Sequence, residues 1–224
     1  MPRAVMVLLV ASCGRIDFDP LGRDGSSGDV VPAVAQTAAQ LGTTQTTQVV
    51  LAPTAPGDLI VVATTNIDTT ASLQSIDDDG SNTYVSSGAT FTCGATLFGE
   101  AWYAVALASA TTVTVTSAGA VRREIWIVDV TGPKRLLAAV GLDDQVGVEA
   151  DNPNVAVSEP ALVVSSMVVA DQIGNELAPG FTALPMVSED DAAYAVVTSP
   201  GSYGARWSVA AMMEYCGLTA AFGS

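Results

Sequence analysis

The sequence predicts an all-β fold, a two-sheet antiparallel sandwich whose two halves repeat one another. Valine and alanine interleave with threonine and serine, a composition that is enriched in strands. Turn residues separate short strand candidates at close spacing, which is typical of sandwiches and barrels. Of the 224 residues, 49% are hydrophobic, yet no apolar run reaches the ~20 residues of a membrane-spanning helix. The apolar side chains are therefore expected to fill a core between two sheets.

Strand candidates follow one another along most of the chain. Threonine and valine alternate between residues 111 and 116, so Val113 and Val115 are expected on one buried face. Residues 134–140 are expected to be a linker, with a helical turn as the alternative. The predicted strands are residues 46–51, 59–64, 81–85, 101–106, 111–116, 124–130, 154–157, 161–169, 181–184, 192–197, 202–209 and 214–221.

The two halves of the chain resemble one another in the order of their strands. Residues 59–62 correspond to 162–164, and residues 102–105 correspond to 193–196. Each half offers four or five strand candidates, too few for a sandwich of its own. The halves are therefore predicted to combine into two packed sheets related by a pseudo-twofold, as two Greek keys do in a jelly roll. Chance similarity between Val- and Thr-rich strands is the alternative interpretation.

Residues 1–13 have the layout of a secretory signal. Arg3 precedes an apolar run, and small residues follow it just before Cys13. The string VASC at residues 10–13 resembles the lipobox of bacterial lipoproteins, which implies cleavage before Cys13 and lipidation of its thiol. Several acyl chains on one residue give lasting membrane attachment. A frayed apolar N-terminus with a buried cysteine is the alternative.

The predicted organisation is a signal peptide at residues 1–12, a lipidated Cys13 and flexible tether at 13–40, and one sandwich domain at 41–224. The tether segment is rich in Gly, Asp and Ser, which favours a flexible spacer. Gly14 stands where an aspartate would favour inner-membrane retention in Gram-negative lipoproteins, so the resemblance implies the outer membrane or the cell surface. The start of the mature chain is similar to that of many lipoproteins from myxobacteria and their relatives.

Short motifs occur in a fixed order: APGDLIVV at 55–62, IDDDGSNTY at 76–84, WYA at 102–104, TVTVT at 112–116, VDVTG at 128–132, and the stretch 194–207. In this order they resemble a jelly-roll domain that is repeated in many bacterial secreted and surface proteins. Ser81 departs from the family pattern as an apparent insertion, and Asp129 replaces the usual glutamate. The resemblance spans residues 40–223 and implies the fold and an extracellular location, but no agreed activity.

Charge and composition exclude several classes of function. The net charge is −15, from 8 basic and 23 acidic residues, so no nucleic-acid partner is expected. The chain has no histidine, which excludes Ser-His-Asp and Cys-His catalysis and His-ligated metals. Carboxylate chemistry and oxygen-ligated calcium remain, and the chain is predicted not to be an enzyme.

The acidic turn at residues 77–82 is the strongest metal candidate. Asp77, Asp79 and Asn82 carry oxygen atoms of the kind that calcium prefers. The adjacent acids and the absence of a glutamate at the twelfth position depart from the EF-hand pattern, and a solvated hairpin turn is the alternative. No other cofactor is expected. The acidic stretches 143–144 and 189–191 are expected to be solvated loops.

Aromatic residues and cysteines supply the remaining candidates. Trp102 and Tyr103 could stack on sugar rings, and packing in the core is the alternative. Because neighbours on a strand point to opposite faces, one of the two is expected to be exposed or covered by a loop. Cys93 and Cys216 are a candidate disulfide outside the cytoplasm, and two buried free thiols are the alternative.

Two functional hypotheses are consistent with these features. The leading one is a non-catalytic, lipid-anchored surface or periplasmic module that serves adhesion, envelope structure or ligand capture. The alternative is a carbohydrate-binding, lectin-like protein assisted by calcium. A third hypothesis, an enzyme acting on polysaccharide, requires Glu100, Asp129 and Glu214 to meet in a groove. The expected partners are the membrane, through the lipid anchor, and a glycan or surface protein.

Overall fold

The computed structural model describes residues 30–67, 73–169, 176–188 and 190–224. This part of the chain forms sixteen strands in four antiparallel sheets and contains no helix. The prediction of an all-β antiparallel sandwich is therefore confirmed. The predicted signal peptide, Cys13 and most of the predicted tether lie outside the described residues. No apolar helix of membrane-spanning length occurs in the described ranges.

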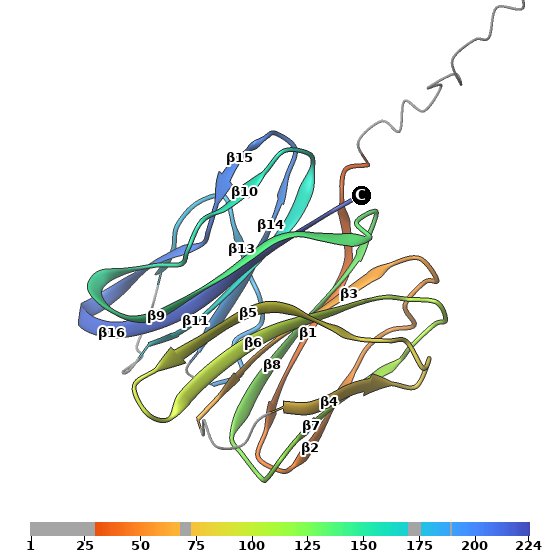
Figure 1. Cartoon of the computed structure of the whole chain (residues 1–224), viewed down its shortest axis with the longest axis horizontal. Helices are drawn as coiled ribbons and strands as arrows, with labels where there is room; N and C mark the ends of the chain where they lie inside the picture. Colours follow the sequence, from red (N-terminus) through yellow and green to blue (C-terminus); the bar gives the residue numbers. More distant parts are fainter. Residues whose placement is uncertain (1–29, 68–72, 170–175, 189) are drawn as a thin grey trace, which may run out of the picture.

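Two large inner sheets pack face to face, one from each half of the chain (Figure 1). The first inner sheet has the order β1 (Ala33–Gly42), β8 (Arg123–Thr131), β3 (Leu59–Asn66), β6 (Leu97–Val105) and β5 (Val85–Cys93). The second has the order β12 (Glu176–Leu177), β16 (Arg206–Gly223), β11 (Ala161–Val169), β14 (Asp191–Val197) and β13 (Thr182–Ala183), with β9 (Arg135–Asp151) paired to β16.

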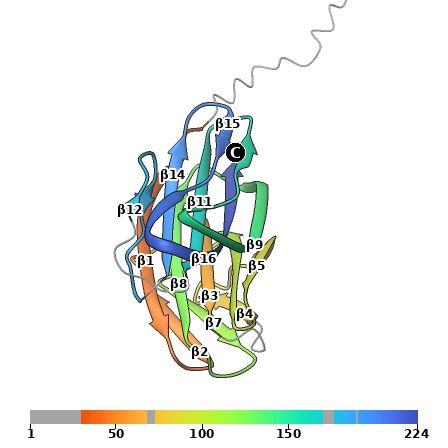
Figure 2. The same ribbon diagram turned by 90° about the vertical axis from the view of Figure 1, so that its left-hand side faces the viewer.

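A small outer sheet covers the far face of each inner sheet. The first outer sheet has the order β2 (Thr46–Val50), β7 (Thr112–Ser117) and β4 (Leu73–Asp78). The second consists of β10 (Val155–Val157) and β15 (Gly201–Tyr203). Figure 2 shows the narrow side of the molecule, with β2 and β7 at one end and β15 at the other. The result is a stack of layers rather than a single pair of sheets.

The strand order repeats between the two halves. β1, β8, β3, β6 and β5 have the same order as β9, β16, β11, β14 and β13. The predicted correspondences of 59–62 with 162–164 and of 102–105 with 193–196 fall on equivalent strands. Each half nevertheless builds its own pair of sheets, so the number of sheets is four instead of the predicted two. The prediction lacked β1, β4, β9 and β12, together with all of β5 except Val85. The jelly-roll description stays a prediction.

The strand β8 is buried on both faces and holds three layers together. Trp126 and Val128 pack against the second inner sheet. Ile125 and Ile127 point to the opposite side and pack against the first outer sheet. Each large apolar side chain contributes roughly 2 kcal/mol when it is fully buried. Burial on both sides explains why this strand is a nearly continuous apolar run instead of an alternating one.

Three segments differ from their predicted structure. The strand β1 begins at Ala33, within the predicted tether, because it pairs with β8 and because the Gln36 amide exchanges two hydrogen bonds of 2.8 Å with the backbone of Ala52. Residues 134–140 are mostly part of β9, since their backbone pairs with β16. Residues 79–84 form the connection between β4 and β5, in which Ser81 has a φ of 59°, so β5 starts only at Val85.

Candidate functional site

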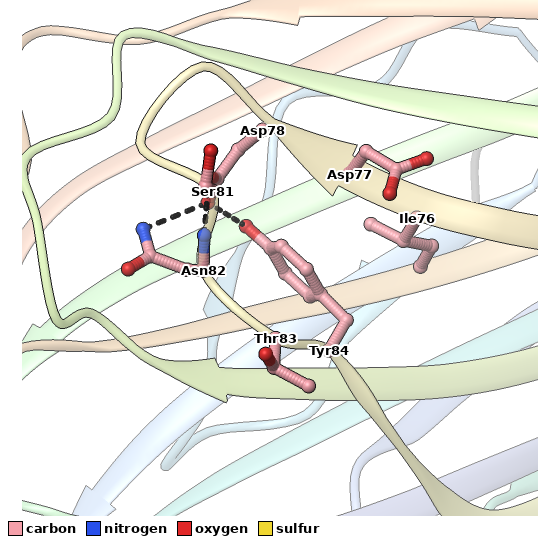
Figure 3. A pocket seen from close by; sticks show the side chains of 7 residues that line it. All are labelled: Ile76, Asp77, Asp78, Ser81, Asn82, Thr83 and Tyr84. Carbon is pink, nitrogen blue, oxygen red and sulfur yellow. Dashed lines mark hydrogen bonds between the residues drawn. The ribbon is translucent and has the colours of Figure 1, made fainter.

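The acidic turn after β4 is held by its own hydrogen bonds (Figure 3). The Asp78 carboxylate accepts hydrogen bonds from the backbone N–H of Asn82 at 2.9 Å, from the Asn82 side-chain amide at 2.9 Å and from the Tyr84 hydroxyl at 3.0 Å. Asn82 Oδ1 in turn accepts the backbone N–H groups of Leu107 at 2.7 Å and Ala108 at 3.1 Å. The turn therefore ties the β4 end to the segment before β7.

The predicted calcium ligands Asp77, Asp79 and Asn82 each bind different groups of the protein. Asp79 accepts hydrogen bonds from the hydroxyl and backbone N–H of Thr111, which lower the pKa of its carboxyl. Asp77 accepts a bond from Ser75 and points away from Asn82 in Figure 3. A hollow of about 560 Å³ lies against this turn, but most of the polar atoms beside it already have protein partners. These contacts favour a structural role for the turn.

Replacing Asn82 with alanine is expected to lower the free energy of unfolding by about 2–4 kcal/mol, because the Leu107 and Ala108 amides and the Asp78 carboxylate lose partners. Urea denaturation measures this loss. Thr83→Ala, at the exposed neighbouring position, is the control and should change stability little. A loss that appears only when calcium is present would contradict the structural role.

Trp102 and Tyr103 lie on opposite faces of β6 and both contact other parts of the fold. The Trp102 indole Nε1 donates a hydrogen bond to Glu100 Oε2 at 2.8 Å. The Tyr103 ring packs against Phe222 between the two inner sheets, with ring centroids 5.3 Å apart. The two aromatic side chains are each partly buried and do not share a surface. They therefore do not form a joint platform for a sugar ring.

The three carboxylates proposed for polysaccharide cleavage are dispersed. Glu100 pairs across the sheet with Thr64, and Asp129 pairs with Ile60. These two partners are four residues apart on β3, which corresponds to ~13 Å along a strand. Glu214 is exposed on β16 in the other half of the chain. The arrangement provides no groove in which two of these acids face one another.

A disulfide and two aspartates close one edge of the stack, which we call the closed edge. Cys93 at the end of β5 is bonded to Cys216 in β16, with a Cα–Cα distance of 5.6 Å. Asp143 accepts the backbone N–H of Thr92 at 2.6 Å, and Asp144 accepts that of Gly94 at 2.8 Å. The expectation of a loop at 143–144 is therefore wrong, because both residues belong to β9, while their side chains are exposed as expected and bind the end of β5.

Among the described residues, one set of His, Cys, Asp or Glu ligand atoms is close enough together to hold a metal ion, namely Cys93, Asp144 and Cys216. Both sulfur atoms of this set belong to the disulfide. The set is therefore part of the closed edge and offers no thiolate for a metal.

Buried polar side chains gather where β3, β6 and β8 approach one another at one end of the first inner sheet, which we call the polar end. On the face toward the first outer sheet, Arg123 Nε donates to Asn66 Oδ1 at 2.5 Å. Burial raises the pKa of Glu100, against the hydrogen bond from Trp102 and the charge of Arg123. Burial also lowers the pKa of Arg123 to about 10, against the charge of Glu100.

This face of the polar end holds several buried atoms without a hydrogen-bond partner in the described part of the chain: Thr64 Oγ1, Asn66 Nδ2, Glu100 Oε1 and Arg123 Nη2. An unsatisfied buried polar group costs about 1–3 kcal/mol. Such groups are rare in folded proteins and require an explanation, such as a bound water or a functional role. The polar end therefore holds most of the unsatisfied buried polar atoms of the first inner sheet.

The opposite face of the polar end holds a buried pair of carboxyl groups. Asp190, before β14, accepts a hydrogen bond from the Thr65 hydroxyl at 2.6 Å, and its backbone N–H lies 3.5 Å from Glu124 Oε1. Asp190 is 7% exposed and Glu124 is 3% exposed. Burial, and next the charge of Glu124, raise the pKa of Asp190 to about 8. Asp190 therefore keeps its proton near neutral pH, and the expectation of a solvated loop is wrong at this residue.

A cavity of about 180 Å³ lies beside this pair of carboxyl groups. It is bounded by the polar end of the first inner sheet and by the last residues of β11 in the second inner sheet. Its walls combine apolar and charged side chains: Ile67, Leu97, Arg122, Glu124, Val168, Val169 and Asp190.

The polar end was not predicted, because the strands were predicted from apolar runs and these residues are polar. The predicted strand 59–64 stops where the polar triplet TTN begins, and the strand 124–130 starts after two arginines. The backbone pairing of β3 and β8 continues through these polar residues. Polar residues directly beside an apolar run were the only sign in the sequence that these strands continue. A cavity beside two buried carboxyl groups can bind a polar group or exchange a proton.

The chain matches no protein family model, no curated protein and no solved structure in comparisons with each of these.

Proposed function

We propose that this chain is a non-catalytic, lipid-anchored β-sandwich held outside the cytoplasm, where it captures a ligand or supports the cell envelope. The observation that carries this proposal is the disulfide between Cys93 and Cys216. Disulfides form and persist in oxidising compartments outside the cytoplasm and are rare inside it. The signal-like N-terminus and the lipobox-like string before Cys13 supply a consistent route of export and attachment.

The fold is compatible with attachment through a flexible segment. The first strand begins at Ala33, so residues 13–32 separate the proposed anchor from the sheets. An extended chain spans about 3.3–3.6 Å for each residue, which allows the sandwich to stand clear of the membrane surface. The dispersed acids Glu100, Asp129 and Glu214 support a non-catalytic role, since they cannot form a two-carboxylate hydrolytic site.

Intact mass of the protein extracted from its native membrane tests the proposal. The expected result is a chain that begins at Cys13, carries added acyl mass and has two fewer hydrogen atoms than the dithiol form. Cys13→Ser is expected to remove the acyl mass, whereas Ser12→Ala keeps a small residue at the cut and should retain it. An unmodified chain that starts at Met1, or a reduced dithiol in the native protein, would reject the proposal.

A further inference from the structure

Two buried aspartates lie next to each other at the end of the first inner sheet that is opposite the polar end. Asp129 of β8 is 1% exposed, and Asp58, which precedes β3, is 5% exposed. The pairing of Leu59 with Val130 places Asp58 beside Thr131, whose hydroxyl donates to Asp58 Oδ1 at 2.9 Å. Asp129 is two residues before Thr131, so it lies diagonally across from Asp58 on the same face of the sheet.

The hydrogen bonds of this pair leave one carboxyl oxygen without a donor. Asp58 Oδ1 accepts the Thr131 hydroxyl, and Asp58 Oδ2 accepts the backbone N–H of Ala55 at 3.1 Å. Asp129 Oδ2 accepts the Gln36 side-chain amide at 2.9 Å, whereas the buried Asp129 Oδ1 has no donor among the described residues. The two carboxyl groups nevertheless form a side-chain hydrogen bond with each other. Ionised carboxylates only accept hydrogen bonds, so this bond requires a proton on one of the two groups.

We propose that Asp58 and Asp129 share one proton, which Asp129 carries and donates to the Asp58 carboxylate, and that loss of this proton releases the turn at residues 52–58. Asp58 is the acceptor because both of its oxygen atoms already receive donors, whereas Asp129 has an oxygen atom that receives none. Two ionised carboxylates in one buried site repel each other, which opposes removal of the proton to solvent.

The surroundings of Asp129 favour its protonated form. Burial raises the pKa of Asp129 most, the hydrogen bond from Gln36 lowers it, and the charge and hydrogen bond of Asp58 raise it further. Because the pKa is higher in the folded state than in the unfolded state, the stabilising contact is present at low pH and is lost as the pH rises through the folded value. The shared proton therefore makes this end of the sheet sensitive to alkaline pH.

The pair holds the turn at residues 52–58 against β1 and β8. Asp58 binds the Ala55 amide within the turn. The Gln36 side-chain amide donates both to Asp129 Oδ2 and to the backbone oxygen of Ala52 at 2.8 Å, and Gln36 Oε1 accepts the Ala52 N–H. When both carboxyl groups are ionised, their repulsion separates Asp58 from Asp129. The bond from the Ala55 amide to Asp58 is then expected to weaken.

Other charged or titratable groups flank the pair on two sides. In the part of the chain that the structure describes, these groups are Tyr84, Asp78, Asp79 and Lys134. Burial and the charges of Asp78 and Asp129 raise the pKa of Tyr84, so its hydroxyl stays neutral. On the other side, Asp58 lines a hollow of about 330 Å³ together with Val30 and Lys134. Movement of Asp58 therefore alters the contact between the sandwich and the segment that precedes β1.

A titration of the folded, full-length protein followed by carbon-13 NMR of the aspartate carboxyl groups tests the shared proton. The Asp58 and Asp129 signals should report the same ionisation step, because coupled groups titrate as a pair. Asp58→Asn replaces the acceptor by an amide that can donate to Asp129, so the titration midpoint of Asp129 should fall by about one pH unit or more. Burial alone predicts no such shift. Glu149→Gln, which removes an exposed acid on β9, should leave the midpoint unchanged.

Amide hydrogen exchange tests the release of the turn. Protection of the Ala55 amide, corrected for the intrinsic exchange rate, should fall as the pH rises through the Asp129 step. The Asn152 amide, which binds the Ala205 oxygen in the other half of the chain, should not respond to that step. Asp129→Asn keeps a donor toward Asp58 but cannot ionise, so Ala55 should remain protected throughout.

Three results would overturn the inference. The first is independent titration of the Asp58 and Asp129 signals, and the second is an unchanged Asp129 midpoint in Asp58→Asn. The third is constant protection of the Ala55 amide through the Asp129 step. The first and third are measured on the wild type, so they decide the question even where a variant does not fold. None of these measurements depends on lipidation of Cys13, so their failure leaves the proposed function untouched.

Discussion

Replacing Cys93 and Cys216 together by alanine is expected to lower the free energy of unfolding by about 4–5 kcal/mol. The disulfide joins positions 123 residues apart and thereby restricts the unfolded chain strongly. It also connects β5 of the first inner sheet to β16 of the second, so its loss removes a covalent link between the halves. An effect of this size is comparable with the whole stability of a marginal domain.

Denaturation in guanidinium measures this loss in a background in which Cys13→Ser removes the third thiol. Addition of a reductant to the unreplaced protein should shift the transition in the same direction, whereas the double-alanine protein should not respond to reductant. A difference below about 1 kcal/mol would contradict the prediction. Titration of two free thiols in the oxidised native protein would also contradict it.

Asp190→Asn is expected to make the protein more stable than the wild type at alkaline pH, by up to roughly 6 kcal/mol for a shift of this size. Folding raises the pKa of Asp190 from 3.8 to about 8, mainly through burial. A raised pKa in the folded state means that stability is fully present below the unfolded pKa and is lost as the pH rises toward 8. Asparagine cannot ionise, so the variant does not lose this stability.

Unfolding free energies measured from about pH 4 to about pH 9 test this prediction. The two proteins should be closest in stability at the acidic end, and the gap should widen with pH. The pKa of Glu100 and that of Asp129 are also raised by burial. The unfolding free energy of both proteins is therefore expected to decrease somewhat as the pH rises. Glu149→Gln is the control, because this exposed acid should leave the slope unchanged. Parallel profiles of the wild type and Asp190→Asn would contradict the role given to Asp190.

The fold could be predicted where apolar runs and turn residues coincide. The strand 161–169 was predicted with the bounds that the structure gives, because it is buried throughout and ends abruptly. The strand β9 was missed, since it is an edge strand whose sequence has little alternation and whose pairing is with the distant β16. Gly141 of β9 lies against the backbone of Thr90 in β5, so closely that a Cβ atom on Gly141 would collide with it. Such a contact between distant segments cannot be recognised from a local sequence pattern.

The candidate site was harder to predict, because its residues come from distant segments. The acids at 77–79 looked like metal ligands, but their oxygen atoms are used by Asn82, Tyr84 and Thr111, which the sequence does not place. Asp190 looked like part of a solvated acidic loop. Its burial beside Thr65 arises only when the second half of the chain packs on the first. Long-range packing thus determined which acids are exposed and which are protonated.

The closed edge also has a consequence for how these molecules behave when crowded together. An unpaired strand at the border of a sheet is a template on which another chain can add, and this addition leads to aggregation. At the end of β5, the backbone amides of Thr92 and of Gly94, which follows the strand, are already occupied by the aspartates of β9. A neighbouring copy that adds at this end of β5 would have to displace these two side chains, so the contacts hinder addition at high local density.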